Sequence, residues 1–221
     1  MFVLRAKAKL TDASDAFVLS GVVGDSLSFG INGTHGPWSK QDHGSASLVF
    51  LYPAAGVDRA LWCAPAGTAV PIGKPLPQAV WAWLEVKSGI AMITQPIFEA
   101  FVPQMLNYES TGGVNFKKGC YPGQEIVARS QFRGTLKRRV YLAHCSEGGA
   151  VGDDVFHAGD ADQPCGLVAA TSANPGGGFD LIISIQVAAA ADAADGKLTL
   201  GKPGGTTLLL EPLPYPLLED I

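Results

Sequence analysis

Alternating hydrophobic and polar residues open the chain. Phe2, Leu4, Ala6, Ala8 and Leu10 are separated mostly by charged residues, and this period of two predicts an amphipathic strand over residues 2–10. Further strands are predicted over 16–24, 47–52 and 59–64, where apolar runs are bounded by Gly, Pro or Asp. The pattern therefore predicts four strands before residue 65.

A helical period follows between residues 78 and 89. Val80, Trp83, Leu84 and Lys87 fall at helical spacing, and Gly89 is a typical end signal. The next stretch, 95–113, contains enough Pro, Asn and Gly to predict partly extended and partly loop structure.

The pattern changes again after residue 134. Short β-like runs cover 138–145, 153–159, 165–173, 179–187 and 198–213, and they are divided by Gly, Asp, Asn and Pro. This spacing is typical of a small antiparallel barrel or sandwich. Residues 188–196 are compatible with a short helical turn or an ordered loop. We therefore predict a first domain over 1–136 and a second over 137–221.

Composition indicates a globular protein outside the membrane. Hydrophobic residues make up 47% of the chain and charged residues 16%, which excludes a disordered chain. The longest apolar run, 181–191, is interrupted by Ser184 and Gln186 and is too short to span a bilayer. The N-terminus has no continuous apolar segment of the kind found in signal peptides. We expect a cytoplasmic location.

The four cysteines are widely spaced, at positions 63, 120, 145 and 165, and no CxxC pair occurs. In a reducing cytoplasm they are expected to be free thiols. The spacing also argues against a closed zinc or iron–sulfur site made by this chain alone, so no metal ligands are predicted.

Basic residues concentrate in one window of an acidic chain. Between Lys117 and Arg139 the chain carries a net charge of +6, while the remainder carries −10. A local basic patch on an acidic protein suits an anionic ligand better than general nucleic-acid affinity. A solvated basic face is the alternative interpretation.

Within this window, residues 117–125 place a cysteine before a predicted helix. Pro122 suits the first turn of a helix, and Glu125 would be stabilised there by the helix dipole. The helix is expected to run through Phe132 and to end at Gly134. Exposed backbone N–H groups and the two upstream lysines would stabilise a thiolate at Cys120. A small buried hydrophobe is the other interpretation of Cys120.

The same residues carry a family resemblance. The run KKGCYPGQE at 117–125 resembles the signature of the YgfZ family, folate-binding proteins related to the glycine cleavage T-protein. Residues 101–139 are similar to the family's core block throughout, and 2–10 and 165–187 are similar more weakly. The resemblance implies an α+β, aminomethyltransferase-like folate-binding fold, with a ferredoxin-like lobe followed by a C-terminal antiparallel β-barrel. Family members usually begin with a further segment, so the first domain is expected to be N-terminally incomplete.

The resemblance implies a tetrahydrofolate-binding accessory factor rather than a catalyst in its own right. Such a factor would support the assembly or repair of iron–sulfur enzymes, including those that modify tRNA, and its partners would be those enzymes or cluster-assembly proteins. The family's functional thiol corresponds to Cys120. The other matching positions are Lys118, Gly119, Tyr121, Gly123, Gln124, Glu125, Arg129 and Gly134.

Folate chemistry assigns roles to several of these side chains. A pterin needs a carboxylate or amide for its N–H groups and an aromatic wall, which Glu125, Gln124 and Tyr121 could supply. Glu85 is a second carboxylate candidate, with an ordinary exposed helix acid as the alternative. Guanidinium groups suit the anionic glutamate tail, which assigns tail binding to the stretch from Arg129 to Arg139, including Arg138. Trp81 and Trp83 are interpreted as packing residues, with pterin stacking as the alternative.

Three other functions remain as alternatives. A folate-dependent one-carbon transferase is disfavoured, because the T-protein's corresponding loop lacks a cysteine and its catalytic aspartate lies in the segment that is missing here. A folate-independent thiol carrier would use the same Cys120. Direct tRNA binding is opposed by the acidic remainder of the chain and by the lack of a basic surface studded with aromatic residues.

Overall fold

The computed structural model describes residues 9–28, 35–70, 73–132, 136–193 and 196–218. The chain divides into two compact units, which we call unit 1 (Met1–Pro53 with Val57–Lys74) and unit 2 (Ala54–Gly56 with Pro75–Ile221). The strand expected over 2–10 lies almost entirely outside the described residues. The domain boundary expected between 136 and 137 stays a prediction.

Unit 1 is built on a four-stranded antiparallel sheet in the order β1-β4-β3-β2. Its strands are β1 (Phe17–Val23), β2 (Lys40–His43), β3 (Ala46–Phe50) and β4 (Arg59–Pro65), and the 3-10 helices η1 (Ser14–Ala16) and η2 (Gly24–Leu27) flank β1. Val22, Leu48 and Trp62 lie on the buried face of this sheet and form part of its core. Leu19, on the opposite face, is 67% exposed. The three predicted strands after residue 10 are confirmed. Strand β2 was not predicted, because its sequence is wholly polar.

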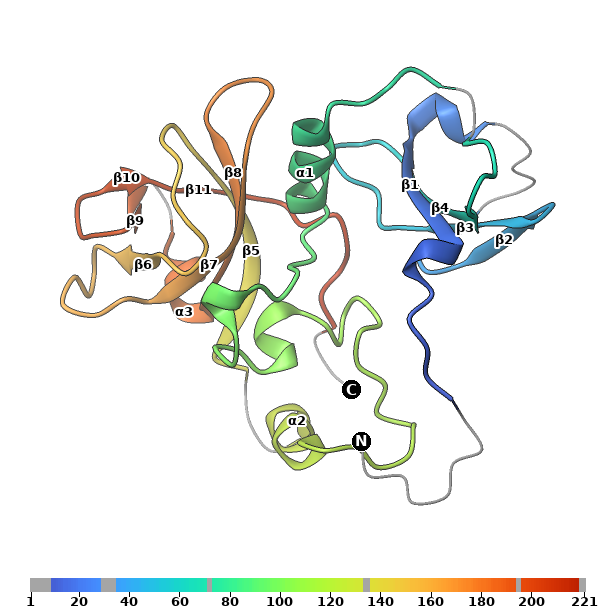
Figure 1. Cartoon of the computed structure of the whole chain (residues 1–221). Helices are drawn as coiled ribbons and strands as arrows, with labels where there is room; N and C mark the ends of the chain where they lie inside the picture. Colours follow the sequence, from blue (N-terminus) through green and yellow to red (C-terminus); the bar gives the residue numbers. More distant parts are fainter. Residues whose placement is uncertain (1–8, 29–34, 71–72, 133–135, 194–195, 219–221) are drawn as a thin grey trace. The chain divides into compact units, whose positions relative to one another are not determined.

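Unit 2 contains a seven-stranded antiparallel sheet in the order β10-β9-β6-β7-β8-β5-β11 (Figure 1). The strands are β5 (Arg138–Cys145), β6 (Asp154–His157), β7 (Gly166–Ala173), β8 (Phe179–Gln186), β9 (Leu198–Leu200), β10 (Thr206–Thr207) and β11 (Leu209–Glu211). The two edge strands, β10 and β11, are separated only by Leu208, whose N–H donates to Leu198 at 2.9 Å. One short segment therefore pairs with both ends of the sheet and makes it a nearly closed barrel.

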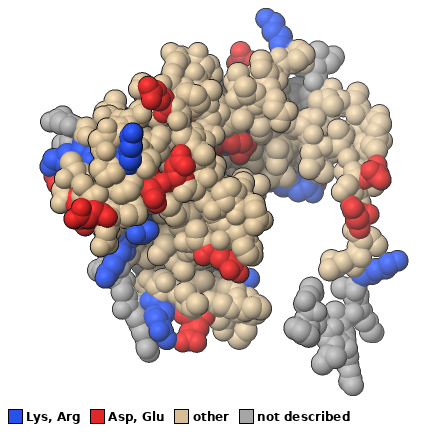
Figure 2. All heavy atoms as spheres, turned by 60° about the vertical axis from the view of Figure 1, so that its left-hand side comes forward, with Lys and Arg blue, Asp and Glu red and all other residues tan. Residues whose placement is uncertain are grey.

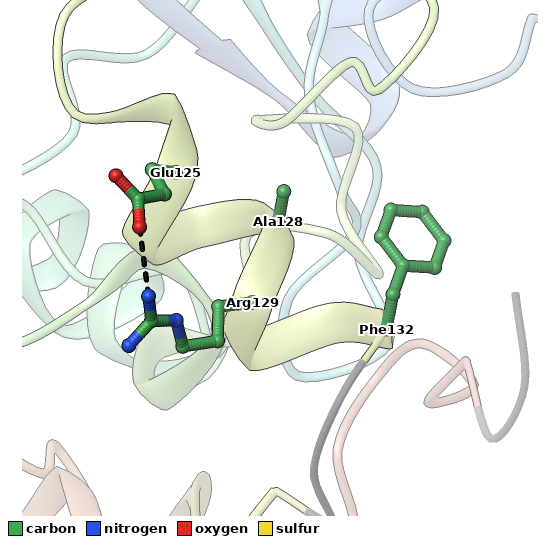
Figure 3. A pocket seen from close by; sticks show the side chains of 4 residues that line it. All are labelled: Glu125, Ala128, Arg129 and Phe132. Carbon is green, nitrogen blue, oxygen red and sulfur yellow. Dashed lines mark hydrogen bonds and ion pairs between the residues drawn. The ribbon is translucent and has the colours of Figure 1, made fainter.

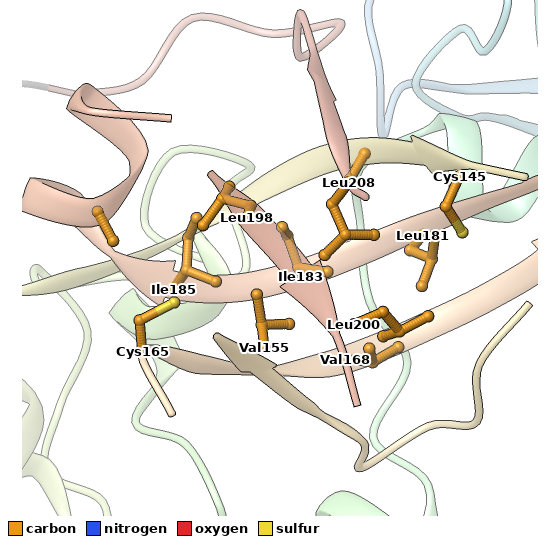
Figure 4. Close-up of a cluster of buried hydrophobic side chains, with 12 residues drawn as sticks. Cys145, Val155, Cys165, Val168, Leu181, Ile183, Ile185, Leu198, Leu200 and Leu208 are labelled. Carbon is orange, nitrogen blue, oxygen red and sulfur yellow. The ribbon is translucent and has the colours of Figure 1, made fainter. Parts of the chain in front are cut away.

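Strand β8 is buried on both faces, which explains its almost continuous apolar sequence. Leu181, Ile183 and Ile185 point into the barrel and pack with Leu198 and other strand residues (Figure 4). Ile182 faces the other way and joins a second cluster outside the barrel. Helix α1 (Gln78–Lys87) contributes Val86 to that cluster, and the 3-10 helices η3 (Gln95–Ile97) and η4 (Pro103–Leu106) contribute Ile97 and Leu106. Helices α1, η3 and η4 therefore pack against the outer surface of the barrel.

A buried carboxylate joins α1 to the barrel. Asp180 on β8 is fully buried, and it accepts hydrogen bonds from Trp83 on α1 (2.7 Å), His144 on β5 (2.7 Å) and Asn174 (2.9 Å). The Lys87 ammonium lies 3.6 Å away. Burial acts to raise the pKa of Asp180, but these hydrogen bonds and the Lys87 charge outweigh it and hold the pKa below its usual value.

The predicted mixture of helix and sheet with a C-terminal barrel is confirmed, and its aminomethyltransferase-like classification stays a prediction. The helix predicted from residue 78 is α1, and the ambiguous 188–196 stretch contains α3 (Val187–Ala191). The Trp83 indole N–H is held by the Asp180 carboxylate, and the interpretation of Trp81 and Trp83 as packing residues stays a prediction. Within the described ranges, no helix has the length and apolar character needed to cross a membrane.

Candidate functional site

Helix α2 (Gln124–Phe132) follows the cysteine loop, as predicted. Its first residue folds back on the loop: the Gln124 side-chain oxygen accepts the Tyr121 N–H at 3.2 Å, and the Gln124 N–H donates to the Tyr121 carbonyl at 3.3 Å. Gly123 has φ +81°, a conformation that side chains disfavour. Pro122 therefore lies in the turn before the helix rather than in its first helical turn. The helix end expected at Gly134 lies outside the described residues.

Cys120 is exposed in this loop. The Lys118 ammonium lies 4.3 Å from the centre of the Tyr121 ring, a distance that suits a cation–π contact. Lys117 and Gly119 are exposed as well, and the Lys117 N–H is held by the Asn115 side chain at 2.8 Å. The exposure rules out the interpretation of Cys120 as a buried core residue.

The other three thiols lie in more protected places. Cys145 and Cys165 are buried in the barrel, and burial raises the pKa of both thiols. Cys63 is half-buried on the outer face of β4. Cys120 is thus the most accessible thiol of the four.

Glu125 and Arg129 form an ion pair one helical turn apart, with 2.7 Å between the carboxylate and the guanidinium. Both side chains are well exposed, so the pair itself adds little stability. A surface hollow of about 350 Å³ lies beside them, and its described lining is completed by Ala128 and Phe132. Figure 3 shows the ion pair at one end of this face and the Phe132 ring at the other.

Eight of the ten predicted site residues fall within 118–129, and the structure brings them together on the loop and α2. The remaining two lie elsewhere in unit 2. Glu85 is half-buried on α1, and Arg138 begins β5 opposite Gln186 in the barrel sheet. The Arg138 charge acts on the buried Cys165 thiol. Arg138 therefore lies at the start of a barrel strand, and its role in binding the glutamate tail stays a prediction.

The face of the molecule in Figure 2 shows no broad basic patch, although residues 117–139 are rich in Lys and Arg. There, acidic and basic side chains are interspersed, and most of the visible surface is uncharged. Arg139 is engaged in a largely buried ion pair with Glu109 at 2.8 Å, and Arg129 is paired with Glu125. Part of the window's positive charge is thus neutralised within the protein.

Sequence reasoning missed two buried amides, one of which contacts α2. Gln104 and Asn107 are both fully buried in the segment before the loop, and Gln104 donates to the Val127 carbonyl of α2 at 2.7 Å. The available signal was a pair of amides inside the otherwise apolar run FVPQMLNY at 101–108. Because buried amides need partners, that pattern could have marked a packing contact.

Comparison with known proteins finds relatives for about two thirds of the chain. Proteins named tRNA-modifying protein YgfZ match at 35% identity in Edwardsiella ictaluri, covering 62% of this chain and 41% of the relative. The corresponding values are 38%, 64% and 43% for Cronobacter sakazakii, and 33%, 63% and 42% for Yersinia enterocolitica. The chain spans about two fifths of the length of these curated relatives. No family model matches the chain. The agreement with several curated YgfZ proteins at 33–38% identity supports membership of this chain in the YgfZ family.

Proposed function

We propose that this chain is an accessory factor in tRNA modification that uses the Cys120 thiol. Its finer role would be to bind tetrahydrofolate and to support the assembly or repair of iron–sulfur enzymes that modify tRNA. The relatives' name supports the link to tRNA modification. The observation that carries the proposal is the exposure of Cys120 in the signature loop that leads into α2.

An exposed thiol at this place suits exchange with a macromolecular partner. The thiolate is the nucleophilic form of cysteine, and the exposed Lys117 and Lys118 lie in the same loop as Cys120. A partner's thiol or a cluster ligand can approach Cys120 without any opening of the core.

The residues on α2 fit one end of a reduced folate. The hollow offers a carboxylate, a guanidinium and an aromatic ring, and its volume lies within the usual range for small-molecule sites. Arg129 would hold a carboxylate of the glutamate tail, and Glu125 would accept hydrogen bonds from pterin N–H groups. The ion pair between Glu125 and Arg129 must open for both side chains to bind the ligand. When bound, the folate would supply one-carbon chemistry.

Replacement of the thiol tests the central part of the proposal. The Cys120→Ser variant is expected to lose support of tRNA modification when it replaces the YgfZ protein of a bacterial host, as measured by mass spectrometry of modified nucleosides. Cys63→Ser, at a half-buried position on β4, is the matched control and should retain full support. Equal support by both variants would refute the proposal.

Folate binding is tested separately by calorimetric titration with 5-formyltetrahydrofolate. Arg129→Gln is expected to weaken binding roughly tenfold, since it removes a charge-assisted hydrogen bond, whereas Lys202→Gln on an exposed barrel loop should leave it unchanged. Absence of binding to the unmodified chain, combined with loss of function in Cys120→Ser, would favour the folate-independent thiol carrier. Turnover of methylene-tetrahydrofolate with an aminomethyl donor would favour the one-carbon transferase.

A further inference from the structure

A fully buried side chain holds the helix that follows the Cys120 loop. Gln104, on η4, donates from its amide nitrogen to the Val127 carbonyl at 2.7 Å and to the Gln131 side-chain oxygen at 3.4 Å. The Gln104 side-chain oxygen is buried without a partner among the described residues. Rotating the amide by 180° would place that oxygen against the Val127 carbonyl, which is also an acceptor, so the donor assignment is well determined.

The segment that carries Gln104 is in turn fixed to the barrel. The Ser184 hydroxyl of β8 donates to the Met105 carbonyl at 2.8 Å. Asn107 ends η4 in the left-handed conformation, with φ 57°. Its amide pairs with both backbone groups of Val140 on β5, donating to the carbonyl at 3.0 Å and accepting the N–H at 3.3 Å. Two barrel strands therefore hold η4 in place.

Helix α2 itself buries few side chains that could hold it in place. Val127 is its one buried residue, while Ile126 is 60% exposed and Phe132 is 57% exposed. Phe132 makes an edge-on contact with Phe116 of the loop, at 5.6 Å between ring centres, which joins α2 to the loop rather than to the barrel. Within the described residues, the hydrogen bonds that join α2 to another helix or strand come from Gln104.

We infer that Gln104 is a positioning residue, which fixes α2 and the attached Cys120 loop in one place on the barrel. The inference rests on the proposed function only in that it treats the Cys120 loop as the functional site. The connection runs from β5 and β8 through η4 to the middle of α2. Loss of the Gln104 amide would leave the barrel intact but would allow α2 and Cys120 to move.

Hydrogen–deuterium exchange of the full chain tests this role directly. Gln104→Met keeps the side-chain volume and removes the donor, and Gln104→Asn keeps an amide that is too short to reach Val127. In both variants the α2 amides are expected to exchange roughly tenfold faster, since one buried hydrogen bond is lost. The β5 and β8 amides should be unchanged. Gln131→Ala, which removes only the 3.4 Å contact, is the control and should have a much smaller effect.

Two further readouts separate positioning from general stability and from the proposed function. The rate of Cys120 alkylation by iodoacetamide should change in Gln104→Met, while the midpoint of barrel unfolding should not. The inference is overturned if α2 exchange is unaffected, or if the barrel amides accelerate as much as those of α2. The two claims can also fail separately. If Gln104→Met accelerates α2 exchange while Cys120→Ser still supports tRNA modification, the positioning role is confirmed and the proposed function is refuted.

Discussion

Four cysteines in this chain occupy three different environments, and this difference determines which thiol is available for chemistry. Cys145 and Cys165 line the barrel core, Cys63 is half-buried on a sheet face, and Cys120 is exposed beside the start of α2. Thiol reactivity depends on access and on thiolate content. Access favours Cys120, and burial makes the two barrel thiols less reactive because it raises their pKa.

Alkylation of the folded protein should therefore be selective. Iodoacetamide is expected to modify Cys120 first and Cys63 more slowly, while Cys145 and Cys165 should react only after unfolding. Peptide mass spectrometry at timed intervals measures the order. Modification of a barrel thiol before Cys120 would contradict the assignment.

Asp180 is the other residue whose environment determines its behaviour. Its pKa is held below the usual 3.8 in the folded protein, so it stabilises the fold above that pH, and this contribution is lost as pH falls through the folded-state pKa. Asp180→Asn is expected to cost roughly 1–3 kcal/mol at neutral pH, because it turns a carboxylate that accepts three hydrogen bonds into an amide whose NH2 group would face a donor. Urea unfolding between pH 3 and pH 7 measures both effects.

The control for that series is Asp162→Asn, at an exposed site. It should change the free energy of unfolding very little at any of these pH values. If the free energy of unfolding of Asp180→Asn decreases on acidification as steeply as that of the parent, this carboxylate is not the source of the acid sensitivity.

The elements were predictable where a periodic pattern specifies them. β1, β3, β4 and α1 follow from alternation or helical spacing, and the Cys120 loop follows from its motif. β2 was missed because Lys40–His43 is a polar edge strand, a common feature of sheet edges. The tether of Gln104 to α2 could not be predicted, because it joins segments 23 residues apart. The Asp180 cluster joins α1 to β8 across 97 residues.

Closure of the barrel at Leu208 predicts how much stability is lost when this side chain is truncated. Leu208 is 1% exposed and joins the two edge strands, whereas its neighbour Leu209 is 56% exposed. Leu208→Ala is expected to destabilise the chain by roughly 2–5 kcal/mol, because it creates a core cavity. Leu209→Ala should cost no more than about 0.5 kcal/mol. Urea denaturation of the two variants compares them directly, and equal costs would argue against closure through this segment.

The whole chain comprises two units, and its matched region accounts for about two fifths of its curated relatives' length. The predicted site residues nevertheless concentrate in one short segment, since eight of the ten lie between Lys118 and Arg129. Buried contacts connect this segment to the barrel, through Gln104 and through η4. The exposed thiol of Cys120 thus lies on a segment that is anchored to the barrel.

The most direct test of this account uses a chain in which Cys120 is the sole cysteine, made by Cys63→Ser, Cys145→Ala and Cys165→Ala. The measurement is the modified-nucleoside content of tRNA in a bacterial host that depends on this chain. The account predicts that the single-cysteine chain supports modification at the parent level once its folding is verified, and that adding Cys120→Ser abolishes that support. Equal support with and without Cys120 would contradict it.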